Sequence, residues 1–479
     1  MRPGTLRAGL VAVLADCGLA RLAYLTSSVV QFNADEAVTG LMVREILDGR
    51  LPVFYAGQQY GGALEQYLEA ALYALTPLPQ TELTLRLPLL ALSVLTCLLV
   101  YLIAREVLAS PGRALLAAAL YAVGPWFNIL GGVTSLGFYV AGQALATAAV
   151  WTALRGRLFR TGLLAGLAVW TAVSALYVLV PVALWLLPEL GRDGRRWART
   201  AAGFGLGALP LLGWLAVHRV LPVPGTPAED SSIPRRLANL ADPVLRQFVG
   251  VAYGHAEGGL WLPVQVALVL ILAGGYVAAL VRRRGFALLR ADRRPADLLL
   301  AVPPVVVVLW AASNSTWYTG TPRYLALTYP LLAVGLAALV PVRSAPVLVA
   351  GTALLSAGFF PTMAGVGPTT ATRDAVFRQV ADQLVARGQG CVYADYWTAM
   401  PLQYLAGDRL TVAVYDGAGR FPRAQAAVAA CADPVYVGNA WGHSDGAIRA
   451  RLDQLGVAYR TRTVDFVTIF EPAPSGGAR

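Results

Sequence analysis

The feature that most constrains this chain is a series of apolar runs, each close to 20 residues long. A helix of that length crosses the roughly 30 Å of hydrocarbon in a bilayer. Only 14% of the residues are charged and 57% are hydrophobic, whereas soluble domains average about 25% charged residues. The pattern therefore predicts a polytopic α-helical membrane protein.

Arginine placement orients the predicted membrane segments. The chain contains no lysine, and its arginines gather in short loops such as 155–160, 191–199 and 282–294. The positive-inside rule assigns these loops to the cytoplasm, and it explains the net charge of +11 without nucleic acid as a partner. We predict eleven segments, at about 6–27, 83–107, 112–131, 137–154, 161–174, 176–190, 200–221, 259–281, 297–313, 323–341 and 346–361.

This orientation predicts a multi-pass protein of the cytoplasmic membrane. The first segment carries Asp16 and Arg21 and lacks a clear cleavage site, so we expect a retained helix with a cytoplasmic amino terminus. An odd number of crossings then places the carboxyl terminus outside. We therefore predict a transmembrane domain over 1–361, which includes a first extracytoplasmic loop over 28–82, and a second domain over 362–479.

The two large outside regions differ in pattern. The first loop predicts two short amphipathic helices on the membrane surface, and its 61–75 stretch is apolar at helical i, i+3, i+4 spacing. The tail predicts a small, mostly parallel α/β domain, because strand-like and helix-like stretches alternate. Cys391 and Cys431 both fall in this tail, where an oxidising compartment permits a disulfide. Sequence does not establish whether their Cα atoms are within reach.

An acidic pair opens the first loop. In "QFNADEAVTG" (31–40), Asp35 and Glu36 lie on the predicted outer face, beside the membrane. An Asp carboxylate there can accept the proton of an attacking hydroxyl. Glu36 can orient the site, or hold a divalent cation such as Mg²⁺ or Mn²⁺ together with Asp35. The competing interpretation is that Asn33 or Asp35 merely caps a helix.

Polar and aromatic residues follow in the same loop. Gln58, Tyr60 and Glu65 lie in "YAGQQYGGALEQY" (55–67), and such groups suit sugar or acceptor hydroxyls. The alternative is a flexible turn between two surface helices. In the tail, Asp395 and Tyr396 follow a predicted strand at the end where open α/β sheets bind ligands, although a helix cap is the simpler explanation.

Arginines at the outer ends of membrane segments run against the charge bias. Arg86 and Arg323 occupy such positions, and a guanidinium offers two parallel donors that match phosphate oxygens. A lipid phosphate would be a suitable partner. The alternatives are headgroup contacts or a neighbouring carboxylate. Tyr318 and Tyr324 would line the cleft that holds this lipid phosphate, or form part of the aromatic belt at the membrane surface.

Taken together, "NADE" after the first helix, "LRLP" at the next and "RYL…YP" late in the bundle resemble the GT-C superfamily. Within it the chain is similar to the protein mannosyltransferase-like branch, which includes the aminoarabinose transferases of lipid A. The resemblance covers roughly residues 1–361 and has its most specific part in the "DE" pair.

The resemblance implies an inverting transfer of a hexose or pentose from a polyprenyl-phosphate donor on the outer face. Asp35 would be the base, Glu36 its companion, and Arg323 the group that holds the carrier phosphate, with Tyr324 and Arg86 beside it. The acceptor would be a glycan, lipid or protein of a bacterial cell envelope. Metal dependence varies within the superfamily.

Two other functions remain open from the sequence. A transporter or flippase of a lipid-linked substrate explains the crossings equally well, but it would usually place ionisable residues at mid-membrane. A non-catalytic scaffold would use the tail to bind envelope partners and leaves the acidic pair unexplained except as a cap.

Overall fold

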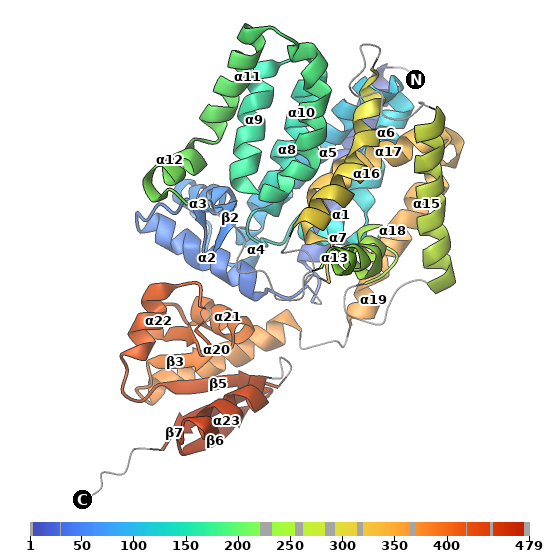
Figure 1. Cartoon of the computed structure of the whole chain (residues 1–479). Coiled ribbons are helices and arrows are strands. Elements are labelled where there is room, and N and C mark those ends of the chain that lie inside the picture. The colour runs from blue at the N-terminus through green and yellow to red at the C-terminus, as the bar shows by residue number, and fades with distance from the viewer. Residues whose placement is uncertain are drawn as a thin grey trace, which may run out of the picture.

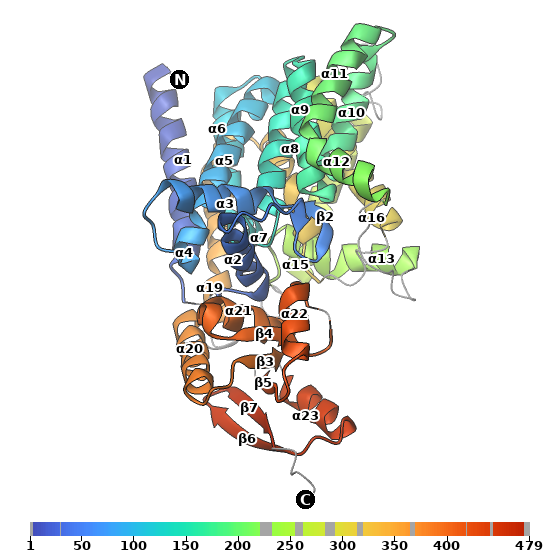
Figure 2. The same cartoon turned by 90° about the vertical axis from the view of Figure 1, so that its left-hand side faces the viewer.

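The computed structural model describes residues 3–28, 30–220, 232–253, 262–282, 293–313, 320–364, 369–417, 419–440 and 444–473. Its chain forms a helical bundle and, at the carboxyl end, a smaller unit built on a β-sheet (Figure 1). The first loop lies between these two parts (Figure 2).

The bundle is made of apolar helices joined by short turns. Its elements are α1 (Pro3–Leu25), α5 (Leu87–Leu108), α6 (Pro111–Val123), α7 (Trp126–Gly131), α8 (Tyr139–Leu154), α9 (Leu158–Thr171), η1 (Val173–Ala175), α10 (Leu176–Leu190), α11 (Gly194–Gly207), α12 (Leu209–His218), α13 (Ile233–Asn239), η2 (Leu240–Val244), α14 (Leu245–Phe248), α15 (Leu262–Arg282), α16 (Pro295–Ala312), η3 (Arg323–Thr328), α17 (Tyr329–Leu339), η4 (Val342–Ser344), α18 (Ala345–Ala357) and α19 (Phe359–Met363).

Several of these helices are able to cross a membrane. Among the described residues, six are long and apolar enough, or seven when the bent pair α11–α12 is taken as one span. Shorter apolar helices occupy the remaining predicted segments, and α9 and α10 are separate, as expected around Ser174. The fold class is therefore that of a polytopic helical membrane protein, while the number of eleven crossings stays a prediction.

Two segments predicted as single helices are broken. The 200–221 segment bends by 73° between α11 and α12, and the 112–131 segment is interrupted between α6 and α7. In both cases a proline, Pro210 or Pro125, stands at the start of the second helix. Proline has no N–H to donate and collides with the preceding turn, so a helix ends before it.

Helices α9 and α11 pack with their backbones nearly in contact (Figure 1). Each presents two glycines four residues apart, Gly162 and Gly166 on α9 and Gly203 and Gly207 on α11. A Cβ atom added to any of the four would lie 2.1–2.2 Å from a carbonyl oxygen of the other helix. Small residues at this spacing let helices approach closely in a bilayer, where packing contacts drive association.

The first loop contains two helices as predicted, but they are not both surface helices. Helix α2 (Ala34–Leu47) is largely buried between the bundle and the C-terminal unit (Figure 2). Helix α3 (Leu64–Leu75) turns its polar residues inward and leaves Leu68 and Leu75 exposed. The turn between them is an ordered hairpin of β1 (Phe54–Tyr55) and β2 (Gln58–Gly62), and the short α4 (Glu82–Leu85) leads into α5.

The C-terminal unit contains alternating strands and helices, as the sequence predicted. Its sheet has the order β4-β3-β5-β7-β6, and helices lie on both sides of it (Figure 2). The expectation of a mostly parallel sheet holds for β4, β3 and β5, whereas β7 and β6 form an antiparallel hairpin at one edge. The elements are α20 (Thr370–Ala386), β3 (Cys391–Ala394), α21 (Tyr396–Ala406), η5 (Gly407–Arg409), β4 (Thr411–Val414), α22 (Pro422–Ala429), β5 (Val435–Asn439), α23 (Ser444–Gln454), β6 (Tyr459–Val464) and β7 (Val467–Pro472).

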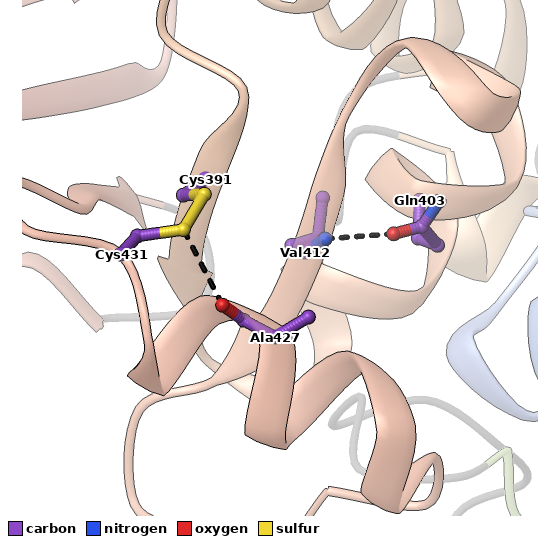
Figure 3. Close-up of a disulfide and its surroundings, with 5 residues drawn as sticks. All are labelled: Cys391, Gln403, Val412, Ala427 and Cys431. Atoms are coloured by element: carbon purple, nitrogen blue, oxygen red, sulfur yellow. Dashed lines mark hydrogen bonds between the residues drawn. A yellow bond between two sulfur atoms is a disulfide. The ribbon is translucent and has the colours of Figure 1, made fainter.

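Covalent and polar links tie this unit together (Figure 3). A disulfide joins Cys391, at the start of β3, to Cys431, just after α22, with their Cα atoms 6.5 Å apart. On the other side of β4, the backbone N–H of Val412 donates to the side-chain oxygen of Gln403 in α21, at 2.7 Å. The disulfide closes a loop of 40 residues. In the chain-entropy model such a loop lowers the conformational entropy of the unfolded chain, which raises the free energy of unfolding by about 4 kcal/mol.

Helix α21 docks the C-terminal unit onto α2. The ring of Tyr404 lies against Gly40, where an added Cβ would come within 2.3 Å of a ring carbon. Arg44 stacks over the same ring, 4.4 Å from its centroid, and its Nη1 donates to the Tyr404 carbonyl oxygen at 3.1 Å. Phe32 packs on the ring as well, with centroids 5.1 Å apart. The two parts therefore share a side-chain interface.

A matched pair of glycine substitutions tests the close packing of α9 and α11. Gly203→Ala places a methyl group 2.2 Å from the Phe159 carbonyl oxygen and should lower the thermal unfolding midpoint in detergent, at a cost of about 1–3 kcal/mol. Gly205→Ala meets nothing within 4 Å, so its better helix propensity should leave the midpoint unchanged or raise it. Equal midpoints for the two variants would contradict this interpretation.

Candidate functional site

The amino-terminal turn of α2 is fixed by a reciprocal cap. Asn33 accepts from the backbone N–H of Glu36 at 3.0 Å, and the Glu36 carboxylate accepts from the N–H of Asn33 at 3.3 Å. Asn33, not Asp35, is therefore the cap, so Asp35 is free of that role. Asp35 is the second residue of the helix, where the positive end of the helix dipole favours a carboxylate.

Glu36 is occupied by a buried ion pair. Arg86 donates through Nε and Nη2 to its two carboxylate oxygens at 2.7 and 2.6 Å, and the backbone N–H of Ser135 adds a third contact at 3.3 Å. Glu36 is fully buried and Arg86 is 3% exposed. The expected roles of Glu36 as a metal ligand and of Arg86 as a lipid-phosphate ligand do not fit this geometry, because each side chain satisfies the other. The sequence allowed Glu82 or another carboxylate as the partner of Arg86, and the structure shows that the partner is Glu36.

Asp35 lies instead where three parts of the chain meet. Its Oδ1 accepts from the Tyr396 hydroxyl at 2.6 Å and lies 3.5 Å from Nη2 of Arg420. Its Oδ2 lies 3.9 Å from Nη1 of Arg323. The Tyr55 hydroxyl donates to its backbone carbonyl at 2.7 Å. The bundle and the C-terminal unit therefore both place donors at the Asp35 carboxylate, while the first loop, which carries Asp35, holds its backbone through Tyr55.

The two arginines differ in how they are held. Arg420 donates to the Ala56 carbonyl oxygen at 3.0 Å. When the Gln58 amide is oriented with its oxygen toward Arg420, both terminal nitrogens of Arg420 lie 2.8–2.9 Å from that oxygen. Arg323 donates through Nε to Thr321 at 3.2 Å, and its side chain is 31% exposed. Its distance from Asp35 is too long for a direct hydrogen bond. Among its contacts with described residues, Arg323 therefore keeps donors available for a ligand.

An apolar cavity of about 240 Å³ adjoins this cluster. Tyr324 follows Arg323 in the chain. The Tyr60 hydroxyl lies 3.3 Å from the Gln58 amide nitrogen when the Gln58 amide oxygen faces Arg420. The remaining walls come from α10, α16 and the turns beside them. The cavity is lined by Tyr60, Phe138, Val173, Ser174, Leu176, Tyr177, Leu309, Ala312, Ser313 and Tyr324.

Glu65 does not line the site. It is fully buried on the inner face of α3, and its Oε1 accepts from the backbone N–H of Ala141 at 2.8 Å. Burial raises the pKa of the Glu65 carboxyl to about 7, although the backbone N–H groups of Ala141 and Val140 oppose the shift. The helical spacing correctly predicted that Glu65 lies outside the apolar face of α3. The polar face that carries Glu65 nevertheless packs against protein rather than water. Tyr318 lies outside the described residues.

A divalent cation does not fit beside Asp35. Both Glu36 oxygens are held by Arg86, and the nearest charged neighbours of Asp35 are the guanidinium groups of Arg323 and Arg420, which would repel a cation. Among the described residues, no cluster of three or more His, Cys, Asp or Glu side chains has a metal-binding arrangement. Every step considered below therefore uses protein groups alone.

Two residues of this cluster come from the tail, where sequence reasoning placed little weight. Tyr396 stood out only as a residue after a predicted strand, and its neighbour Asp395 is indeed a helix cap, accepting from the N–H groups of Trp397 and Thr398. Arg420 gave no signal, because it is one of many arginines in a polar region. Only the docking of α21 on α2 brings both to Asp35.

Comparison with known proteins supports the fold. No family model matches the sequence, and no curated protein matches it. Among solved structures, ArnT from Cupriavidus metallidurans bound to undecaprenyl phosphate matches with a TM-score of 0.58 and 13% identity, over 99% of both chains. The Archaeoglobus fulgidus oligosaccharyltransferase in complex with Zn and sulfate matches with a TM-score of 0.55 and 14% identity, over 96% of this chain and 73% of that one. Both neighbours belong to the GT-C superfamily, so the resemblance seen in the sequence is confirmed at the level of the fold.

The buried position of Glu65 predicts a pH dependence of stability. A carboxyl with a raised folded-state pKa binds its proton more tightly in the folded protein, so stability falls as the pH rises from about 4.5 to about 7. Glu65→Gln should reduce this fall and stabilise the protein above pH 7 by on the order of 3 kcal/mol. Thermal unfolding in detergent over that range measures it. The partly exposed Glu45→Gln is the control, and an unchanged slope in Glu65→Gln would refute the assignment.

Proposed function

We propose that this chain, which has the GT-C fold, is a membrane glycosyltransferase that moves a sugar from a polyprenyl-phosphate donor to an acceptor hydroxyl. The observation that carries the proposal is one carboxylate, Asp35, flanked by Arg323 and Arg420 beside an apolar cavity. A base, a phosphate ligand and a lipid-compatible wall are the groups that this reaction requires. The reaction would take place on the outer face of the cytoplasmic membrane.

Asp35 would act as the general base. The acceptor oxygen attacks the anomeric carbon from the side opposite the phosphate, the carbon–oxygen bond to the phosphate breaks, and the acceptor proton passes to Asp35. A single displacement of this kind inverts the anomeric configuration. The cap on α2 and the Glu36–Arg86 pair hold the helix turn that carries Asp35, and such rigid placement is what general-base catalysis needs.

Arg323 would bind the donor phosphate. The leaving group is a polyprenyl phosphate whose negative charge grows as the bond breaks, and a guanidinium already in place stabilises that charge. Tyr324, next in the chain, and Tyr60 line the adjoining cavity, whose mainly apolar wall suits the part of the isoprenoid chain nearest the phosphate. Gln58 and Tyr60 would be the polar groups of the hairpin that contact the sugar or the acceptor.

Substrate range stays broad in this proposal. ArnT was solved with undecaprenyl phosphate, and the Archaeoglobus enzyme was also solved with an inhibitory peptide and a dolichol phosphate. We propose a lipid-phosphate-linked hexose or pentose as the donor of this chain and a glycan, lipid or protein of the cell envelope as its acceptor.

The role of Asp35 is tested in proteoliposomes supplied with polyprenyl-phosphate sugars and an envelope extract as acceptor. Asp35→Asn should lower the transfer rate by about 10²–10⁴-fold while donor binding is largely retained, because an amide cannot accept the proton. Asp48→Asn, at the exposed far end of α2, is the control. Near-normal transfer by Asp35→Asn would eliminate the catalytic role. If the wild type consumes no donor but moves it across the bilayer, the protein is a transporter.

The role of Arg323 is tested with the same assay. Arg323→Gln removes the charge and the guanidinium donors but keeps a polar side chain, so the apparent donor affinity should fall by on the order of tenfold or more. Polyprenyl phosphate without sugar should lose its inhibition of the reaction to the same degree. Arg387→Gln, an exposed arginine of α20's C-terminal end, is the control. Inhibition that is equally strong in Arg323→Gln and the wild type would refute phosphate binding at this position.

A further inference from the structure

The Tyr396 hydroxyl already occupies one carboxylate oxygen of Asp35. It donates to Oδ1 at 2.6 Å, the shortest contact that this carboxylate makes in the described structure. Asp35 is only 5% exposed, and its other polar neighbours are the more distant Arg323 and Arg420. A substrate hydroxyl that is to give its proton to Asp35 needs the same kind of contact, at a similar distance.

The cap of α21 and the docking of α21 on α2 hold the Tyr396 hydroxyl beside Asp35. Tyr396 is the first residue of α21, and Asp395 caps that helix through the N–H groups of Trp397 and Thr398. The guanidinium of Arg420 lies 5.0 Å from the centre of the Tyr396 ring. Further along α21, Tyr404 docks on α2, the helix that carries Asp35. The cap and the docking interface therefore fix the hydroxyl relative to the carboxylate.

The hydroxyl can only donate in this position. Burial raises the pKa of the Tyr396 hydroxyl well above its ordinary value, and the negative charge of Asp35 raises it further. Tyr396 therefore stays protonated and offers Asp35 a hydrogen bond without taking its proton. Such a contact covers the base but does not perform the transfer.

Water competes with the acceptor for the bound donor, so a group that covers Asp35 would limit hydrolysis. A water molecule beside an uncovered Asp35 could attack the anomeric carbon of a bound donor, pass one proton to Asp35 and release free sugar and polyprenyl phosphate. That reaction has the same bonds broken as transfer but wastes the donor. Exclusion of water until the correct acceptor arrives is a general way in which enzymes prevent this side reaction.

We propose that Tyr396 is a specificity-determining residue that covers Asp35 against water, and that the acceptor hydroxyl displaces it. The inference rests on the proposed glycosyl transfer and adds a function for the C-terminal unit, which delivers the covering hydroxyl. An acceptor held by several contacts can displace one hydrogen bond, whereas a single water molecule has little else with which to offset its loss.

The experiment compares wild type with Tyr396→Phe, which removes the hydroxyl and keeps the ring over Arg420. Proteoliposomes with a polyprenyl-phosphate sugar are assayed without acceptor for free sugar, and with acceptor for product. We expect the ratio of hydrolysis to transfer to rise about tenfold, the effect of one hydrogen bond to a charged group. Tyr393→Phe removes a hydroxyl from β3 of the same unit, where the ring packs on Tyr436, and should keep the wild-type ratio.

A second readout does not depend on turnover. A water-soluble carbodiimide modifies accessible carboxylates, and mass spectrometry follows the modification of Asp35. Labelling of Asp35 should be faster in Tyr396→Phe than in the wild type and in Tyr393→Phe, while labelling of the exposed Asp48 is equal in all three.

The possible outcomes separate the two proposals. An unchanged ratio of hydrolysis to transfer in Tyr396→Phe, or unchanged labelling of Asp35, overturns the covering role. A proportional loss of both reactions also overturns it, because Tyr396 would then position the base. A wild type that neither hydrolyses nor transfers a lipid-linked sugar refutes the proposed function itself, and the labelling result still decides whether Tyr396 covers Asp35.

Discussion

The buried ion pair between Glu36 and Arg86 is the contact on which the rest of the site depends. It joins the first turn of α2 to the start of α5 through two short, charge-assisted hydrogen bonds with almost no exposure. Removal of one partner would leave an uncompensated charge in the interior, at a cost of about 3–5 kcal/mol. Because Asp35 precedes Glu36, the pair also sets where the Asp35 carboxylate points.

The same helix carries a second constraint further along its length. Gly40 admits the Tyr404 ring, and Arg44 holds it in place, so the C-terminal unit docks one helical turn beyond Asp35. This docking brings Tyr396 and Arg420 to a carboxylate that the bundle alone would leave beside Arg323.

Sequence patterns gave the local structure well where periodicity was strong. The strands and helices of the tail lie where their alternation predicted, and "NADE" does begin a helix in the first loop. The patterns were wrong where a property depends on neighbours distant in sequence. Periodicity separated Glu65 from the apolar face of α3 but could not tell that its polar face meets α8 rather than water. Arg86 was recognised as unusual, but its partner lies 50 residues away.

The sequence by itself determined that this chain is a polytopic helical membrane protein, because apolar length and arginine placement are local properties of the chain. The GT-C-like arrangement was implied by the resemblance of its "NADE", "LRLP" and "RYL…YP" motifs. The same resemblance singled out Asp35, because the acidic pair alone is also explained as a helix cap. The tertiary structure decided the division of labour within the pair, giving Glu36 to Arg86 and leaving Asp35 to face Tyr396, Arg323 and Arg420. The physical reason is that hydrogen bonds and ion pairs act over a few ångströms. Only the folded chain brings residues hundreds of positions apart within that range.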